Sequence, residues 1–431
     1  YRFATQALVW EFASGWREPI LPYTLKISQW RDLSIGVCMN EDKTVDHFLY
    51  AYESILNDML LHNVIPSFAG HFQNSAPEIQ RQLELLEKHG GRLTLPNREY
   101  NIASPVTVDA SSLCFSGEMW ACNTDPNGVF ETDHGTKLRM RGRDFAALKI
   151  GKKADPISGA VVKNLGIQGD IEGMDTRPLV DFANPTKMSG LCLDSVRTDQ
   201  CEFSKLSFCG LANAVCIADN AEVDACLFEK LNVDGCGNGF YFAPRAAYYN
   251  RFRSCIVADN PFYGFYACGK DRNMHNLEVQ DNTFVRTGGG FVDGDALIPA
   301  ALLFDHINAS SVDHNLFDDP GTFWFFEKNA GNNDMRTPSY RKTVAIYVIG
   351  SENRITDNTI LHSSDASICV QGDKNVLLNN IADGDVRISG NGNIVVNQVF
   401  ISQAARLILE GGAADNTTIV GVPEDRIIRR G

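Results

Sequence analysis

Residues 214–242 read AVCIADNAEVDACLFEKLNVDGCGNGFYF. The stretch opens with a short apolar strand at 214–217, continues with a second apolar strand, and opens again 25 residues later at 239–242. Short apolar strands separated by Gly, Asn and Asp are typical of all-β chains. A unit that repeats at this length indicates a solenoid, which grows along one axis as a single domain.

The same unit recurs along most of the chain. Openings at residues 190, 214, 239 and 264 are separated by 24, 25 and 25 residues, and those at 345, 367 and 385 by 22 and 18. A propeller blade would need about 40 to 45 residues, and a β-sandwich would show stricter alternation with hairpin turns. The full set of openings is 147–150, 190–193, 214–217, 239–242, 264–267, 301–304, 345–348, 367–370, 385–388 and 406–409. We therefore expect an all-β fold, a right-handed parallel β-helix (solenoid), over residues 90–431.

The second strand of several units begins with a polar pair that ends in Asn. These pairs stand at 281–282, 314–315, 357–358 and 379–380. Asn side chains stacked along a solenoid axis can satisfy each other's amide groups. We expect this set to be structural.

Two regions depart from the repeat. Residues 1–89 contain two amphipathic segments, Val45–His62 and Pro77–His89, which predict an N-terminal α-helical segment that caps the β-helix. The steps from 264 to 301 and from 301 to 345 are too long for one turn, which places long loops at 288–299 and 318–343. Long loops on a rigid scaffold often carry function.

The composition of the chain disfavours several classes of ligand. The 431 residues carry a formal net charge of −14, which disfavours nucleic acid and anionic membrane surfaces as ligands. We see no run of 18 apolar residues and no signal peptide, so we expect a chain that is either secreted or cytoplasmic and has no membrane partner. Most of the 12 cysteines lie in apolar runs and none has Cys-x-x-Cys spacing, which predicts free thiols, no metal site and no cofactor.

One stretch resembles a known superfamily. Residues 90–117 (GGRLTLPNREYNIASPVTVDASSLCFSG) look like the opening of pectate-lyase-like β-helix enzymes, in which a Gly-rich strand and a Pro turn lead into the first rungs. The resemblance implies a right-handed parallel β-helix that acts on a polysaccharide.

The order of features is more specifically similar to that of the inulin fructotransferases, β-helix enzymes that release a fructan end as a cyclic difructose anhydride. The similarity rests on the opening, the early rung at 161–169, the rung count and the long loop after 315–317. That family's catalytic Asp and Glu lie before and after a Cys-Gly-Asn turn. The similar turn here is 235–238, with Glu229 before it and Tyr241 after it, so the pair is not matched as a pair.

Glycosidic-bond chemistry needs two carboxyl groups about 5 to 10 Å apart, one as acid and one as base or nucleophile. Neighbouring rungs of a β-helix lie about 4.8 Å apart, so carboxylates on adjacent rungs meet this spacing. Asp219 follows the opening strand one unit after that of Asp194, and Glu229 and Asp281 lie in the central rungs. We expect the catalytic pair to come from these four residues, although any single one could be a solvated turn residue.

Residues 240–272 are rich in aromatic and basic side chains. Aromatic faces stack on sugar rings and Arg binds hydroxyl or carboxylate groups, although about half of the aromatics must belong to the core. The expected substrate-binding residues are Tyr241, Arg245, Tyr249, Arg251, Lys270, His275, Glu278 and, in the second long loop, Trp324.

The sequence therefore predicts a carbohydrate-active enzyme that cleaves or cyclises a fructan-like oligo- or polysaccharide, as a glycoside hydrolase or an intramolecular glycosyl transferase. A polysaccharide lyase that acts on a uronate-containing glycan is the first alternative, with Arg251, Lys270, His275 and Tyr249 as candidate residues. A non-catalytic glycan-binding β-helix is the second. The aromatic run 323–326 suits either a subunit contact in a homotrimer or a lid over the site.

Overall fold

The computed structural model describes residues 74–87, 90–120, 135–152, 155–170, 184–217, 219–288, 298–326, 336–340 and 342–431, without the side chains of 323–326 and 336–340. The chain divides into two compact units, Tyr1–Asp58 and Met59–Gly431, and all described residues belong to the second. The predicted helix Val45–His62 lies outside the described residues. The second predicted helix is confirmed as α3 (Ala76–Glu87), which packs its buried face against the first rungs.

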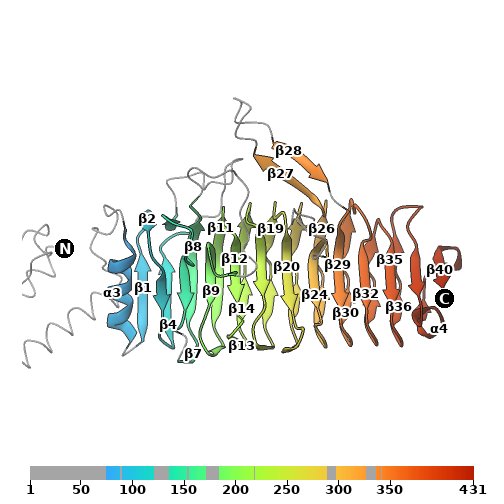
Figure 1. Cartoon of the computed structure of the whole chain (residues 1–431), viewed down its shortest axis with the longest axis horizontal. Coiled ribbons are helices and arrows are strands. Elements are labelled where there is room, and N and C mark those ends of the chain that lie inside the picture. Colours follow the sequence, from blue (N-terminus) through green and yellow to red (C-terminus); the bar gives the residue numbers. More distant parts are fainter. Residues whose placement is uncertain are drawn as a thin grey trace, which may run out of the picture. The chain divides into compact units, whose positions relative to one another are not determined.

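The described part is a right-handed parallel β-helix, as the sequence predicts (Figure 1). One wall is a 12-stranded parallel sheet, here sheet B. Its strands are β3 (Val106–Val108), β6 (Leu148–Ile150), β9 (Ser189–Leu193), β12 (Asn213–Ile217), β16 (Asn238–Phe242), β20 (Tyr263–Cys268), β24 (Ala300–Asp305), β29 (Val344–Ile349), β32 (Ile368–Gln371), β35 (Val386–Ser389), β38 (Leu407–Glu410) and β40 (Ile427–Arg430). Ten of these strands, β6 to β38, coincide with the predicted unit openings, and the structure adds β3 and β40 at the two ends.

The opposite wall is a 21-stranded sheet, sheet A, whose strands form two columns. Column A1 consists of β1 (Gly91–Leu95), β4 (Leu113–Gly117), the first halves of β8 (Val161–Gln168) and β11 (Glu202–Cys209), β14 (Leu227–Glu229), β18 (Arg251–Arg253), β22 (Glu278–Gln280), β25 (Ser311–Asp313), β30 (Arg354–Thr356), β33 (Val376–Leu378), β36 (Ile394–Val396) and β39 (Thr418–Val420). Column A2 consists of β2 (Glu99–Ile102), β5 (Lys137–Met140), the second halves of β8 and β11, β15 (Asn232–Asp234), β19 (Ile256–Ala258), β23 (Thr283–Val285), β26 (Leu316–Asp318), β31 (Thr359–Leu361), β34 (Ile381–Ala382) and β37 (Val399–Phe400).

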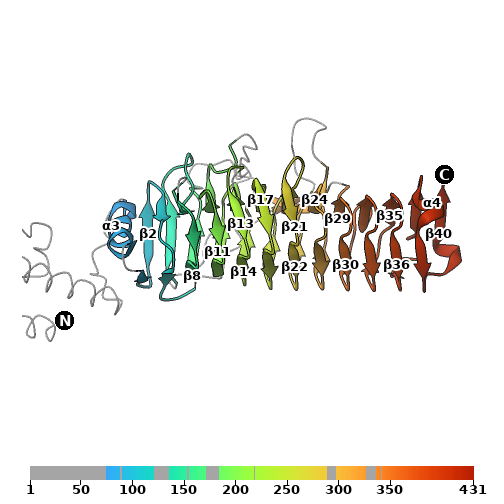
Figure 2. The same ribbon diagram turned by 90° about the horizontal axis from the view of Figure 1, so that it is seen from below.

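A short five-stranded sheet, sheet C, joins sheet B to column A1 along the lower edge in Figure 1. Its strands are β7 (Ile157–Ser158), β10 (Thr198–Asp199), β13 (Glu222–Asp224), β17 (Ala246–Tyr248) and β21 (Asn273–His275), and Figure 2 views them from below. A short helix α4 (Ala413–Asn416) and a 3₁₀ turn (Glu424–Arg426) lie near the C-terminus. None of the helices described is long and apolar enough to cross a bilayer.

The core follows from the period-two pattern of these short strands. Most three-residue strands bury only their central residue, so one apolar side chain per strand points inward and the two neighbours face outward. The inward rings stack from rung to rung: Phe228 lies 5.0 Å from Phe203 and 4.6 Å from Phe252, centroid to centroid. The ten cysteines among the described residues are free thiols, as predicted.

The predicted Asn ladder is confirmed. The amide of Asn282 donates to Asn315 at 3.0 Å, Asn315 to Asn358 at 3.0 Å, and Asn358 to Asn380 at 3.0 Å. A second ladder, formed by Asn353, Asn375 and Asn393, precedes column A1. Each ladder satisfies buried amides along the axis, which removes the cost of burying them.

The turns that follow the strands of columns A1 and A2 and of sheet C are often a single residue in the left-handed region, with φ near +55°. Asn, Asp and His tolerate this conformation better than other non-Gly residues. The predicted loop 318–343 differs from expectation, because it contains an antiparallel hairpin of β27 (Thr322–Phe326) and β28 (Arg336–Tyr340). The aromatic run in β27 has high strand propensity, which explains why this segment pairs with β28. Residues 289–297 of the other predicted loop lie outside the described residues.

Candidate functional site

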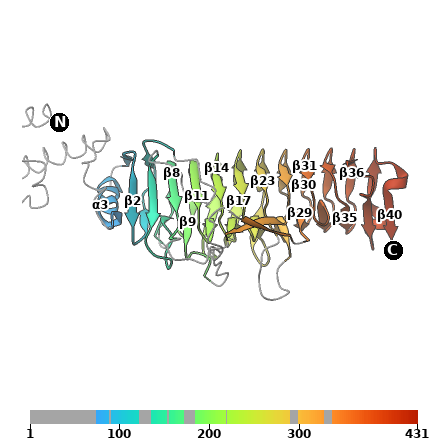
Figure 3. The same cartoon turned by 90° about the horizontal axis from the view of Figure 1, so that it is seen from above.

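Polar side chains line the edge where column A2 ends and the chain turns toward sheet B. In successive rungs the left-handed residue after the A2 strand is Asp259, Arg286, Asp319 and His362. Backbone bonds hold them in register: the Asp259 N–H donates to Val285, Arg286 to Asp318, and Asp319 to Leu361. We call these four residues the edge row. Figure 3 views this edge from above, with the hairpin β27–β28 in front of it.

Arg286 organises the first half of the edge row. Its guanidinium donates to both carboxylate oxygens of Asp259, at 2.7 and 2.8 Å. The hydrogen bond to Asp259, supported by the charges of Asp259, Asp234 and Asp319, raises the pKa of Arg286 against the effect of burial. The Asp259 side chain is only 12% exposed, so the guanidinium fixes it in one orientation.

His362 organises the second half. Its Nδ1 lies 2.8 Å from Asp318 Oδ1 and 3.9 Å from Asp319 Oδ1. The hydrogen bond with Asp318, followed by the charges of Asp318, Asp319 and Asp383, raises the pKa of His362 although desolvation opposes it. The imidazole thus stays protonated to a higher pH than a free histidine, and it is 69% exposed.

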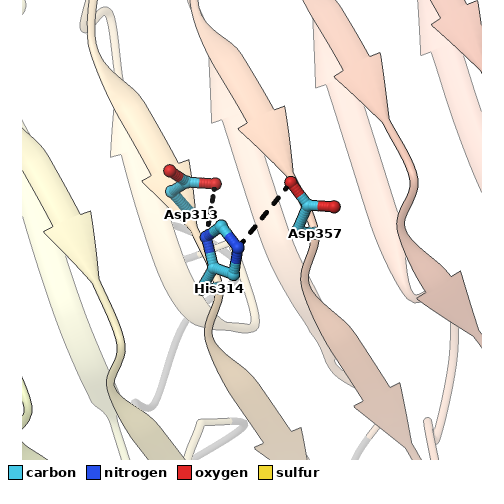
Figure 4. Close-up of side chains that lie close together, drawn as sticks. All are labelled: Asp313, His314 and Asp357. Carbon is cyan, nitrogen blue, oxygen red and sulfur yellow. Dashed lines mark ion pairs between the residues drawn. The ribbon is translucent and has the colours of Figure 1, made fainter.

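Two clusters of the described residues bring together three groups that could bind a metal ion. One is Asp318, Asp319 and His362 in the edge row. The other is Asp313, His314 and Asp357 at the bend between A1 and A2 (Figure 4), where His314 lies between the two carboxylates, 3.1 Å from Asp313 and 3.9 Å from Asp357. His and carboxylate ligands suit Zn²⁺ or Mn²⁺. The sequence predicts no metal site, and these two clusters are where that prediction can be tested.

A groove lies at the opposite edge, where sheet C meets column A1. Its volume is about 530 Å³, and Tyr249, Arg251, Glu278, Glu352 and Arg354 contribute to its lining. Three of the predicted substrate-binding residues, Tyr249, Arg251 and Glu278, are therefore gathered in one place.

Comparison with known proteins bears on the fold. No protein-family model and no curated protein sequence matches this chain. Solved structures do: DFA-IIIase from Arthrobacter chlorophenolicus A6 in complex with GF2 aligns at a TM-score of 0.60 and 16% identity, over 82% of this chain and 92% of that one. Its complex with DFA-III aligns at 0.59 and 15%, over 83% and 93%. The fold resembles that of DFA-IIIase. The architecture expected from the sequence resemblance is thereby confirmed, and identity this low shows the fold alone.

The β-helix places the four predicted catalytic carboxylates on two different walls. Asp194 and Asp219 follow the neighbouring strands β9 and β12 of sheet B, where Asp194 pairs with Lys149 at 3.4 Å and Asp219, 62% exposed, pairs with Arg272 at 2.9 Å. Glu229 and Asp281 belong to sheet A, Glu229 at the end of β14 and Asp281 at an A1–A2 bend. They offer two separate pairs on opposite walls, and their catalytic role stays a prediction.

The remaining predicted substrate-binding residues lie on several sheets and turns of the β-helix. Tyr241 lies on the outer face of sheet B, 5.3 Å from the Tyr266 ring, and burial raises its pKa to about 12. Arg245 pairs with Glu222 at 3.3 Å, and Lys270 is exposed in a turn between sheets B and C. His275 packs its ring against Tyr248 on sheet C, at 4.8 Å. Trp324 belongs to β27, and its side chain lies outside the described residues, as does the predicted trimer contact at 323–326.

Sequence reasoning missed Arg286, Asp318, Asp319 and His362. A signal was present, because the Asn residues that begin the A2 strands at 282, 315 and 358 are each followed four residues later by an edge-row member. Aligning the units on these Asn residues would have placed the edge-row side chains on one line.

Proposed function

We propose that the protein is a carbohydrate-active enzyme that cleaves or cyclises a fructan-type oligosaccharide by carboxylate acid–base chemistry at the edge row. The observation that carries this proposal is the order carboxylate, guanidinium, carboxylate, imidazole in four successive rungs. The likeness to DFA-IIIase, whose solved structures hold GF2 or DFA-III, supports a saccharide as the ligand.

The spacing of Asp259 and Asp319 suits the chemistry. They are separated by the single rung of Arg286, so their backbones lie about 10 Å apart along the axis. Two catalytic carboxyl groups near the upper limit of the range of about 5 to 10 Å leave room for an attacking oxygen beside the sugar. One carboxyl group gives its proton to the leaving glycosidic oxygen, and the other takes the proton of the attacking hydroxyl. Water as the attacker gives hydrolysis, and a hydroxyl of the neighbouring sugar gives a cyclic product.

Arg286 and His362 have supporting roles in this scheme. Arg286 holds Asp259 in place through two hydrogen bonds, so Asp259 serves as the base with a fixed direction of attack. His362, whose pKa is raised chiefly by its hydrogen bond with Asp318, lies 3.9 Å from Asp319 and in its protonated form can return a proton to it between turnovers. Asp319 is then the acid.

The hairpin β27–β28 adds a means to exclude water. It leaves the helix three residues after Asp319 and its strands pair only with each other among the described strands. A solved DFA-IIIase structure is described as lacking its lid. We assign the corresponding role here to β27–β28, which closes over the bound sugar.

Carboxylate-to-amide variants test the placement. Asp259→Asn and Asp319→Asn should each lower kcat/KM on inulin-type oligosaccharides by about 10²-fold or more, with an unchanged unfolding temperature. Asp219→Asn, Glu229→Gln and Asp281→Asn test the pairs predicted from sequence. If these three variants abolish turnover while Asp259→Asn keeps it, the site lies on another wall.

The reaction class is read from the products. The protein is incubated with inulin, levan, arabinan, pectate and alginate, and products are identified by mass. A disaccharide with the mass of two fructoses less two waters indicates cyclisation, and one with the mass of two fructoses less one water indicates hydrolysis. A product with the absorbance of an unsaturated uronate would replace this proposal with the lyase alternative. No product from any glycan would favour a binding module.

A further inference from the structure

The groove between sheet C and column A1 is built from one repeated position. The left-handed residues after the sheet C strands, and in the corresponding turns of the next rungs, are Ala225, Tyr249, Asn276, Ala309 and Glu352, all in the groove lining. Backbone bonds from Ala225 to Tyr248, from Asn276 to Ala309 and from Ala309 to Ser351 keep them in register. Five rungs span about 19 Å, so the groove can follow an extended chain of several sugar units.

Tyr249 presents an aromatic face in this groove. It is 60% exposed and holds φ at +57°, a conformation that is unfavourable for a bulky side chain. The neighbouring rungs carry Ala225 on one side and Asn276 on the other, so no large side chain at the equivalent position covers the ring. An exposed aromatic ring in a groove is the group that stacks on a sugar face.

Two cations of the groove have no acidic partner among the described residues. Arg251 and Arg354 lie three strands apart on the same outward column, through Glu278 and Ser311. Neither guanidinium forms a hydrogen bond or ion pair within the described part of the chain. The acidic residues that could neutralise them are bound by other cations.

Glu278 stands beside Arg251 in the strand register, but its carboxylate is taken by Arg253 at 2.9 Å. Glu352 pairs with Lys374 at 3.6 Å. The groove therefore keeps two unpaired positive charges on a chain whose net charge is −14. Guanidinium groups bind carboxylates through paired hydrogen bonds, and more tightly than neutral hydroxyls.

We propose that this groove is a second glycan-binding site, separate from the edge row, which takes an acidic oligosaccharide with carboxylates on its sugar units. Tyr249 and Arg251 belong to the same rung, so Tyr249 stacks on a sugar near one end of the ligand and Arg251 binds a carboxylate beside it, while Arg354, three strands along the column, binds a carboxylate nearer the other end. The site lies on the opposite edge of the helix from Asp259 and Asp319, so it anchors the protein to an acidic glycan without taking part in the reaction.

Direct binding tests this proposal independently of turnover. Tetragalacturonate is titrated into the full-length protein by calorimetry, with an inulin-type tetrasaccharide as the uncharged probe. We expect binding of tetragalacturonate that weakens as salt is raised, and at least about tenfold weaker binding in Arg251→Ala/Arg354→Ala and in Tyr249→Ala. Arg430→Ala, which removes the cation of an exposed ion pair between β40 and β38, is the control and should bind like the parent.

The Asp259→Asn/Asp319→Asn variant separates this proposal from the edge-row proposal. It should bind tetragalacturonate normally even though turnover is lost, and a parent protein without any fructan activity should still bind it. Three results would overturn the second site: no binding, equal binding of the uncharged probe, or binding that survives the double Arg substitution.

Discussion

The A2–B and C–A1 edges of the β-helix have the same type of turn but carry different side chains. At both edges one left-handed residue per rung turns the chain, yet the A2–B edge carries Asp259, Arg286, Asp319 and His362, while the C–A1 edge carries mostly small residues around Tyr249. At the first edge the charged groups form ion pairs, and at the second Arg251 and Arg354 have no ion-pair partner in the part of the chain that the structure describes. The turn conformation is the same at both edges, so the side chains at the turn positions determine what each edge can bind or catalyse.

Substitutions in the Asn ladders should have the largest effect on stability. Asn358 lies in the ladder that precedes column A2, and Asn375 in the one that precedes A1, and each bonds an Asn on both sides. Removing either amide leaves buried partners unsatisfied, so Asn358→Ala and Asn375→Ala should each lower the free energy of unfolding by about 3 kcal/mol. Denaturant titration measures this loss.

Activity at low temperature then distinguishes the two ladders. Asn358 directly precedes β31, the strand that leads to His362, so Asn358→Ala should also lower turnover, whereas Asn375→Ala, in the ladder before A1, should not. Equal loss of turnover in both variants would mean that the edges are coupled through the whole helix and are not separate sites.

Deletion of the hairpin should affect the two edges differently. Because β27 and β28 pair with each other and with none of the other described strands, replacing residues 322–340 by a short linker should leave the unfolding temperature nearly unchanged. Turnover at the A2–B edge should fall roughly tenfold as water enters, while tetragalacturonate binding at the C–A1 edge should persist. Full activity of the deletion would exclude the lid role.

The smallest effect is the pH dependence of the Asp318–His362 pair. The pKa of His362 is raised in the folded protein, so the pair stabilises the fold fully below the unfolded pKa of histidine and the contribution disappears as pH rises through the folded value. Both groups are exposed, so the contribution should stay below about 1 kcal/mol.

Unfolding midpoints of the parent and of His362→Gln between pH 5 and pH 9 measure this difference. The two proteins should converge at high pH and separate at low pH. A constant difference across the range would show that His362 acts through packing and not through its charge.

Much of the fold could be predicted because it depends on local pattern. The openings at 190, 214, 239 and 264 became β9, β12, β16 and β20, and the polar pairs ending in Asn became a buried ladder. The hairpin was missed because a length excess in the repeat shows only that residues are inserted, and pairing within the insertion depends on where its two halves meet.

The candidate site was predicted less well. The sequence placed carboxylates in the central rungs but could not say which wall each one faces, because Asp194 and Glu229 both follow apolar strands and differ only in the sheet that their strand joins. Tyr249, Arg251 and Glu278 were predicted together, since all three come from a single pair of neighbouring rungs.

Short-range periodicity was enough to predict the repeat, the inward apolar residue of each strand and the Asn ladder before column A2. The alignment of the edge row, by contrast, depends on the folded chain: Asp259, Arg286, Asp319 and His362 form one line only there. Their spacing in the chain varies with the length of every insertion between rungs, whereas their spacing in space is set by the constant hydrogen-bonded distance between parallel strands.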